Sequence, residues 1–244
     1  MAQRRIDVLL VRWYERRERS GPVMARWVAA AEEHLPVALP RRFGDREPLR
    51  GRLDRDGPDG LAAAYERADQ LFFLAGEPPV HAGSLSAGEA RWGPVAVHTL
   101  HVELGSADEA VRRFALAVAG EHTFYVSASV EHDLLLDGRT LVSDRPSTGE
   151  PYLAAFGDWV GLPPRPPLWA WFGPAYAPLV RRHLDADPEA GGLLRTAGPW
   201  VPDALVARLD EVDPARRNAA RMPRGLRRST WRMLVDGARA GRRR

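Results

Sequence analysis

Cysteine is absent from the 244-residue sequence, which excludes disulfides, thiolate metal sites and catalysis by a thiol. Lysine is also absent, so all 35 basic residues are arginine. We attribute this bias to codon usage in a GC-rich genome rather than to function. No apolar run reaches the roughly eighteen residues that a membrane-spanning helix needs. These absences suit a cytoplasmic protein.

Positive charge is concentrated at one end of the chain. Residues 216–244 contain eleven arginines and one acidic residue, which gives a net charge of +10. Residues 1–215 contain 24 arginines and 31 acidic residues, which gives a net charge of −7. The sequence therefore predicts a single, mildly acidic domain over 1–215 and an arginine-rich tail over 216–244.

Apolar patterns near the start of the chain predict one strand and two helices. Arg5–Tyr14 is expected to be a strand buried on both faces rather than a signal peptide, because its apolar run is interrupted and no small-residue cleavage site follows. An apolar stripe predicts a helix over Ser20–Leu35. Residues 39–49 have the composition of a loop, and a short helix is expected over Leu61–Ala68.

Further alternation predicts a sheet built from several strands. An inward apolar stripe that includes Phe114 predicts a helix that Ser106 or Asp108 caps and that ends near Ala119. We expect strands over Gln70–Ala75, Val80–Leu85, Val95–Leu104 and Thr123–Val130, and Leu134–Val142 would pair with the last of these through a turn at Asp137-Gly138. Two β-α units with extra strands between them predict an α+β fold. The sheet would be mixed or antiparallel, with helices packed on one face. The more specific prediction is a ferredoxin-like core with insertions.

Aromatic residues gather after a proline-rich stretch. Strand alternation over residues 168–172 points Trp169 and Trp171 to one side, so both faces of this strand need cover. Core packing is the commoner role of such residues. Tryptophan and tyrosine are also enriched at interfaces, so Trp159, Trp169, Trp171 and Tyr176 form a candidate partner-binding set.

His98 and His101 first suggest a metal site, but residues three apart on a strand point to opposite faces. We therefore expect His98 to be a core histidine and no metal to bind. His101 and Glu103 share a face, which Tyr125 and Ser127 of a neighbouring strand would extend. Such a polar sheet face is commonly solvated. Its functional alternative is a hydrolase or a metal enzyme.

Catalytic and cofactor motifs are missing from the sequence. It contains no Gly-x-Ser-x-Gly elbow, Walker-type loop, His-Glu-x-x-His pair or Gly-x-Gly-x-x-Gly after a strand. We therefore expect no catalytic residue and no cofactor, and we favour a binding protein over an enzyme.

The arginine-rich tail suggests a second function. Arg224, Arg227, Arg228 and Arg232 are typical of it, and arginine pairs well with phosphate. A solubilising, disordered tail is the commoner role for such a composition. A nucleic-acid-associated protein that works through this tail is the alternative function.

Three segments, Leu39–Pro48, Trp169–Tyr176 and Ala219–Pro223, resemble motifs of uncharacterised actinobacterial proteins similar to immunity proteins of polymorphic toxin systems. In order, these motifs cover most of residues 5–225. The resemblance implies a cytoplasmic, non-catalytic protein that binds and neutralises a cognate toxin. It assigns no active-site residue. The acidic charge of residues 1–215 would suit a basic partner such as a nuclease toxin.

Overall fold

The computed structural model describes residues 3–17, 23–88, 95–105, 108–138, 140–143, 150, 153–155, 158–159, 161–198 and 200. The predicted tail over 216–244 therefore lies outside the described residues, and so do the four arginines chosen to represent it. Within the described part, no helix combines the length and the apolar character needed to cross a bilayer.

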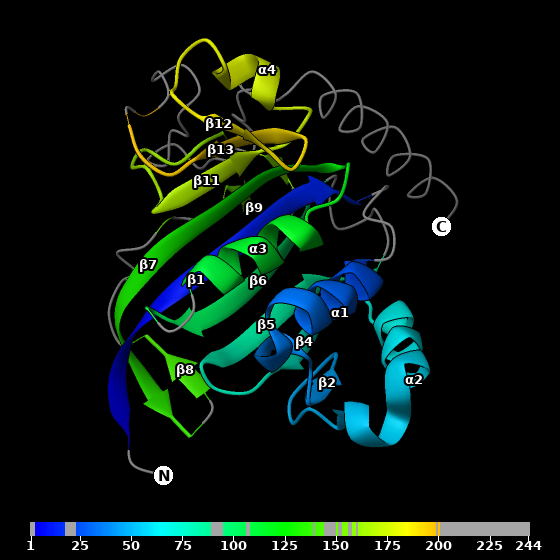
Figure 1. Ribbon diagram of the computed structural model, residues 1–244. Coiled ribbons are helices and arrows are strands. Elements are labelled where there is room, and N and C mark those ends of the chain that lie inside the picture. The colour runs from blue at the N-terminus through cyan, green and yellow to red at the C-terminus, as the bar shows by residue number, and fades with distance from the viewer. Residues whose placement is uncertain are drawn as a thin grey trace, which may run out of the picture.

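One antiparallel sheet of eleven strands organises the described residues (Figure 1). Its order is β12-β13-β11-β7-β1-β6-β5-β4-β2-β3, and β8 pairs with β7 outside this path, whereas β9 and β10 pair only with each other. The strands are β1 (Arg4–Arg16), β2 (Arg42–Gly44), β3 (Gly51–Arg52), β4 (Leu71–Ala75), β5 (Val80–Ser86), β6 (Val95–Glu103), β7 (Thr123–Asp137), β8 (Thr140–Val142), β9 (Ala154–Ala155), β10 (Asp158–Trp159), β11 (Trp169–Phe172), β12 (Asp187–Glu189) and β13 (Gly192–Arg195).

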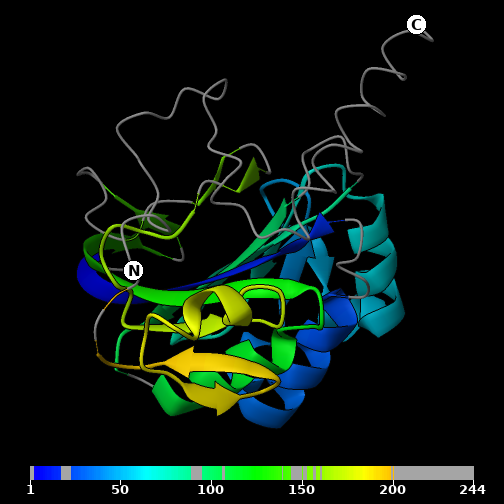
Figure 2. The same cartoon turned by 90° about the horizontal axis from the view of Figure 1, so that it is seen from above.

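The longer helices cover one face of this sheet, which we call the helix face. Helices α1 (Val23–His34) and α3 (Asp108–Val118) lie side by side on it, and α2 (Leu53–Arg67) lies beside β2 and β3 (Figures 1 and 2). The shorter elements are the 3₁₀ helix η2 (Pro36–Ala38) and α4 (Ala177–Val180). An α+β fold with an antiparallel sheet is therefore confirmed, while the ferredoxin-like core stays a prediction.

Strand β1 lies at the centre of the sheet because apolar residues alternate on both of its sides. Leu9, Val11 and Trp13 are buried on the helix face, and Leu10 and Tyr14 are buried on the other face. The strand pairs with β6 on one side and with β7 on the other. The prediction of a strand buried on both faces is confirmed.

The core of the helix face is built around three aromatic rings. Trp13, Trp27 and Phe114 contact one another with ring centroids 5.0–6.1 Å apart. Their indole groups can be buried because each N–H donates to a backbone oxygen: Trp13 Nε1 to Ala115 at 2.8 Å and Trp27 Nε1 to Ala38 at 3.1 Å. Helices α1 and α3 thus carry their apolar stripes against the sheet, as predicted.

The segment expected to be a loop over 39–49 contains strand β2. Phe43 holds it in place, since its buried ring packs 5.9 Å from Phe72, centroid to centroid. Gly51 on β3 lies directly against that ring, and a Cβ there would be 2.2 Å from it. Burial of one aromatic side chain therefore turns a loop composition into a short strand.

Two boundaries also differ from those expected. Helix α2 begins at Leu53 rather than Leu61 and bends at Gly57, whose φ of 67° glycine tolerates well. Strand β7 continues past Val130 to Asp137, because its second half pairs with the start of β1 and with β8. The turn at Asp137-Gly138 forms as predicted, but it joins β7 itself to β8.

Candidate functional site

The face of the sheet turned away from α1 and α3, which we call the opposite face, gathers the predicted polar residues. Across β1, His101 is level with Leu10, and Ser127 is level with Arg12. His101 and Ser127 therefore share this face, with β1 between them. Two strand spacings of about 5 Å and an offset of two residues along the strands separate their backbones by roughly 12 Å. Ser127 and His101 thus do not form the hydrogen-bonded pair that an activated nucleophile requires.

Much of this polar face is buried rather than solvated. Tyr125 and Ser127 are fully buried, and burial raises the pKa of Tyr125 well above its usual value. Glu103 at the other end is half-exposed and accepts two hydrogen bonds from Arg4, at 3.0 and 2.6 Å. These hydrogen bonds lower the pKa of Glu103. The four predicted residues share a face but form no single site.

Arg12 organises a buried charged cluster that the sequence interpretation missed. Its Nη2 lies 3.4 Å from Glu131 Oε1, and its Nη1 lies 3.8 Å from Glu150 Oε2. Ser129 Oγ donates to the same Glu150 oxygen at 2.5 Å. Burial raises the pKa of Glu150, although Arg12 and Ser129 oppose that shift. Arg12 stands inside an apolar run, which was a usable signal, whereas nothing near Glu150 marked it.

A groove of about 1070 Å³ lies on the opposite face and runs from β6 across β5 and β4 to β2 and β3. We call it the β2–β6 groove. Ala75 and Ala82 lie in its floor, and Arg42 and Arg52 stand at one end, with His101 at the other. Among the predicted site residues that the structure describes, only His101 lines this groove.

A β-bulge brings a second histidine into the groove. The register between β5 and β6 shifts between Val80 and Ala82, so His81 is the extra residue, and its side chain lies 3.5 Å from Glu103. Bulges commonly re-aim a side chain in this way. Burial lowers the pKa of His81 and, together with the charge of Arg12, lowers that of His101 to about 4. Both imidazoles are therefore neutral near pH 7.

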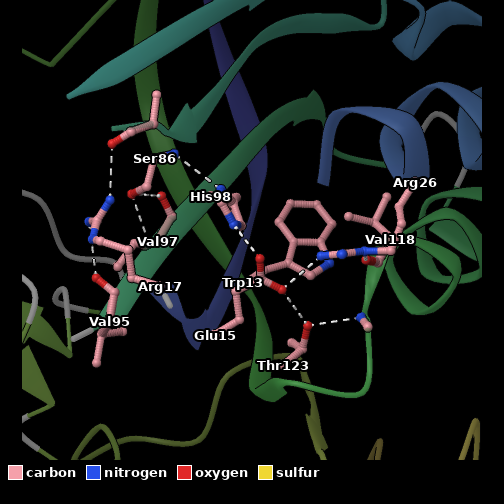
Figure 3. Close-up of polar contacts among 12 residues, drawn as sticks. Trp13, Glu15, Arg17, Arg26, Ser86, Val95, Val97, His98, Val118 and Thr123 are labelled. Atoms are coloured by element: carbon pink, nitrogen blue, oxygen red, sulfur yellow. Dashed lines mark hydrogen bonds and ion pairs between the residues drawn. The ribbon is translucent and has the colours of Figure 1, made fainter. Parts of the chain in front are cut away.

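His98 belongs to a different, fully buried network near the end of β1 (Figure 3). Its Nε2 lies 3.0 Å from Glu15 Oε1, while its Nδ1 accepts a hydrogen bond from the Ser86 backbone N–H at 3.1 Å. Arg26 and Thr123 donate to the other Glu15 oxygen at 2.8 and 2.9 Å. Both imidazole nitrogens are occupied, so His98 is the core histidine that was predicted.

Among the described residues, no three histidine, aspartate or glutamate side chains converge. A His98–Glu15 pair resembles part of a catalytic triad, but a triad histidine needs one nitrogen free for the nucleophile. Ser86 occupies that nitrogen here.

The aromatic candidates lie inside the protein. Trp169 and Trp171 are 5% and 2% exposed and pack into the core of the helix face. Trp159 and Tyr176 belong to a second core on the opposite face, with ring centroids 5.8 Å apart. Core packing is thus their role in the described structure, and they offer no exposed ring to a partner.

Comparisons with known proteins identify a related fold but no family. No protein-family model matches the chain, and no curated protein matches it. Among solved structures, the Pseudomonas aeruginosa T6SS protein PA0821 has a similar fold, with a TM-score of 0.51 and 13% sequence identity. The similarity covers 84% of this chain and 73% of that one. At this identity the likeness concerns the fold.

Proposed function

We propose that the protein is a cytoplasmic, non-catalytic binding protein of immunity type, which neutralises a cognate toxin by masking its surface. The observation that carries this proposal is the likeness of fold to a T6SS protein over 84% of the chain. The resemblance of three sequence segments to immunity-like proteins supports the same class. Both rest on features spread over most of the domain rather than on one motif.

The arrangement of the polar residues supports binding rather than catalysis. His98 has both nitrogens occupied, and His101 lies too far from Ser127 to activate it. Glu103 is held by Arg4. The described residues therefore offer hydrogen-bonding surface and charge, but these histidines and hydroxyls are not placed for proton transfer between them.

The shape of the opposite face also suits a macromolecular partner. At about 1070 Å³ the β2–β6 groove lies at the upper end of the roughly 300–1,000 Å³ that is usual for small-molecule pockets. It crosses five strands instead of enclosing a cavity. A groove of this form suits a segment of a partner protein.

We further propose that the sheet contains a ferredoxin-like core. The spatial order β7-β1-β6-β5, with α1 after β1 and α3 after β6, matches the split β-α-β arrangement. Strands β2, β3 and β4 with helix α2 would then be an insertion that extends one edge and supplies most of the groove.

Co-expression with the toxin encoded beside this gene tests the function. We expect growth to be restored and a stable one-to-one complex to elute from a sizing column. An unrelated immunity protein serves as the control. Failure to bind or protect against the adjacent toxin would reject the proposal. Salt-sensitive binding to nucleic acid that disappears on deletion of residues 216–244 would favour the alternative function instead.

A further inference from the structure

We propose that the β2–β6 groove binds an extended, acidic segment of a partner protein. The partner's identity as a toxin rests on the proposed function, whereas the chemistry of the segment rests on the groove alone. Its carboxylates would face Arg42 and Arg52, and its aliphatic side chains would lie against the apolar parts of the lining.

The length of the groove fits a peptide. Arg42 on β2 is directly opposite Arg52 on β3 and Ala75 on β4, and Ala82 on β5 is opposite His101 on β6. The pairing of Leu74 with Gly83 then places Ala75 beside Ala82. These side chains form one row of five strands, and four spacings of about 4.8 Å give roughly 19 Å. An extended peptide of about six residues spans that distance.

The small residues of this row make the room that a segment needs. Ala75 and Ala82 occupy the middle of the row and leave the floor low between longer side chains at each end. Leu49, Phe73 and Leu141 add apolar surface to the lining. Burying aliphatic side chains of a partner against these residues would stabilise the complex.

The charges at the β2–β3 end favour an acidic segment. Like charges directly opposite each other on neighbouring strands repel, and Arg42 and Arg52 are such a pair. Asp54 accepts hydrogen bonds from Arg52 at 3.0 and 2.6 Å, but Arg42 forms no ion pair within the described part of the chain. Glu47 is the other acidic lining residue. A carboxylate brought to Arg42 would relieve the repulsion.

The opposite end of the groove offers hydrogen bonds without charge. His101 Nδ1 is buried and has no hydrogen-bond partner among the described residues. The bulge on β5 brings His81 beside it. A buried polar atom left without a partner is costly, so a peptide group reaching His101 would supply a missing interaction.

A protein segment fits these features better than a single nucleic-acid strand does. Binding of single strands depends on aromatic rings that stack with the bases. Phe73 is the one phenylalanine, tyrosine or tryptophan of the described groove lining, and its ring is half-buried. Aliphatic side chains and two opposed arginines match an acidic, aliphatic peptide.

The test uses the full chain and a labelled, end-blocked hexapeptide of alternating leucine and glutamate, followed by fluorescence anisotropy. We expect saturable, salt-sensitive binding, which Arg42→Glu weakens by at least about tenfold through loss of a charge-assisted contact. Ala82→Phe, which fills the floor without changing charge, should weaken it similarly. Arg181→Glu, the same charge change at an exposed site on the C-terminal side of α4, should leave affinity within about twofold.

Several outcomes would overturn the assignment. These are binding that Arg42→Glu and Ala82→Phe both leave unchanged, equal binding of a leucine-arginine hexapeptide, and Arg42-dependent binding of an oligothymidine in place of the acidic peptide. Circular dichroism and urea unfolding confirm that each variant is folded. A toxin complex that forms equally well with Arg42→Glu would reject the groove but keep the proposed function. Peptide binding without any toxin complex would reject the proposed function but keep the groove as a peptide-binding site.

Discussion

His98 Nε2 lies 3.0 Å from Glu15 Oε1, and neither side chain reaches solvent. The Ser86 N–H occupies Nδ1, so the imidazole must carry its proton on Nε2 and donate it to Glu15. Burial opposes ionisation of Glu15, but hydrogen bonds from His98 and Thr123 and the charge of Arg26 outweigh it and lower the pKa. A charged carboxylate is therefore held inside the core by its donors.

We predict that Glu15→Ala destabilises the fold by about 3–5 kcal/mol, because it leaves the buried donors of Arg26, His98 and Thr123 without their acceptor. Urea unfolding at pH 7 measures the effect. Glu33→Ala removes an exposed carboxylate from α1 and should change stability by less than about 0.5 kcal/mol. Equal effects of the two substitutions would contradict the network's role.

Glu150 is predicted to behave in the opposite way. Burial raises its pKa, so its ionised form is the unfavourable one. Glu150→Gln imitates the protonated carboxyl group and should change the free energy of unfolding at pH 7 by less than about 1 kcal/mol, or increase it. The same urea experiment compares it with Glu15→Gln, which should destabilise. A large loss in Glu150→Gln would show that its ion pair with Arg12 dominates.

Stability should rise with pH between about 4 and 6.5 because of His101. Its pKa falls from 6.5 to about 4 on folding, so the unfolded chain binds a proton in this window and the folded protein does not. The contribution is fully present above pH 6.5 and is lost as the pH falls towards 4. Because His101 is partly exposed, we expect this contribution to the free energy of unfolding to be about 1–2 kcal/mol.

Urea unfolding at pH 7 and pH 5 measures this dependence, and His101→Gln should flatten it within that window. An unchanged slope in His101→Gln would mean that another group takes up the proton.

The aromatic strand supplies a prediction about packing. Trp171 is 2% exposed and donates to the Glu189 backbone oxygen at 2.8 Å. We expect Trp171→Ala to cost about 3–5 kcal/mol, since it removes the ring and leaves a cavity. Leu168→Ala, three positions away and 49% exposed, should cost less than about 0.5 kcal/mol. Thermal or urea unfolding of both variants makes the comparison, and similar losses would contradict the core assignment.

The local elements were largely predictable because periodicity reports local burial. Alternation of apolar residues predicted β1 as a strand buried on both faces, and the apolar stripe of α3, including Phe114, predicted the side that packs. The same reasoning separated His98 from His101, since a strand must turn residues three apart to opposite faces. The spacing of side chains within one strand or helix is therefore enough to predict which of its faces is buried.

The sequence by itself determined the α+β class and which side of each long element is apolar. It limited the sheet to a mixed or an antiparallel one. Only the tertiary structure decided what each polar residue meets. Arg12 faces Glu150 across 138 positions of chain, and a single-residue bulge brings His81 beside His101. The groove arises from the strand order β6-β5-β4-β2-β3. Register and strand order depend on contacts between distant segments, and no local spacing encodes them.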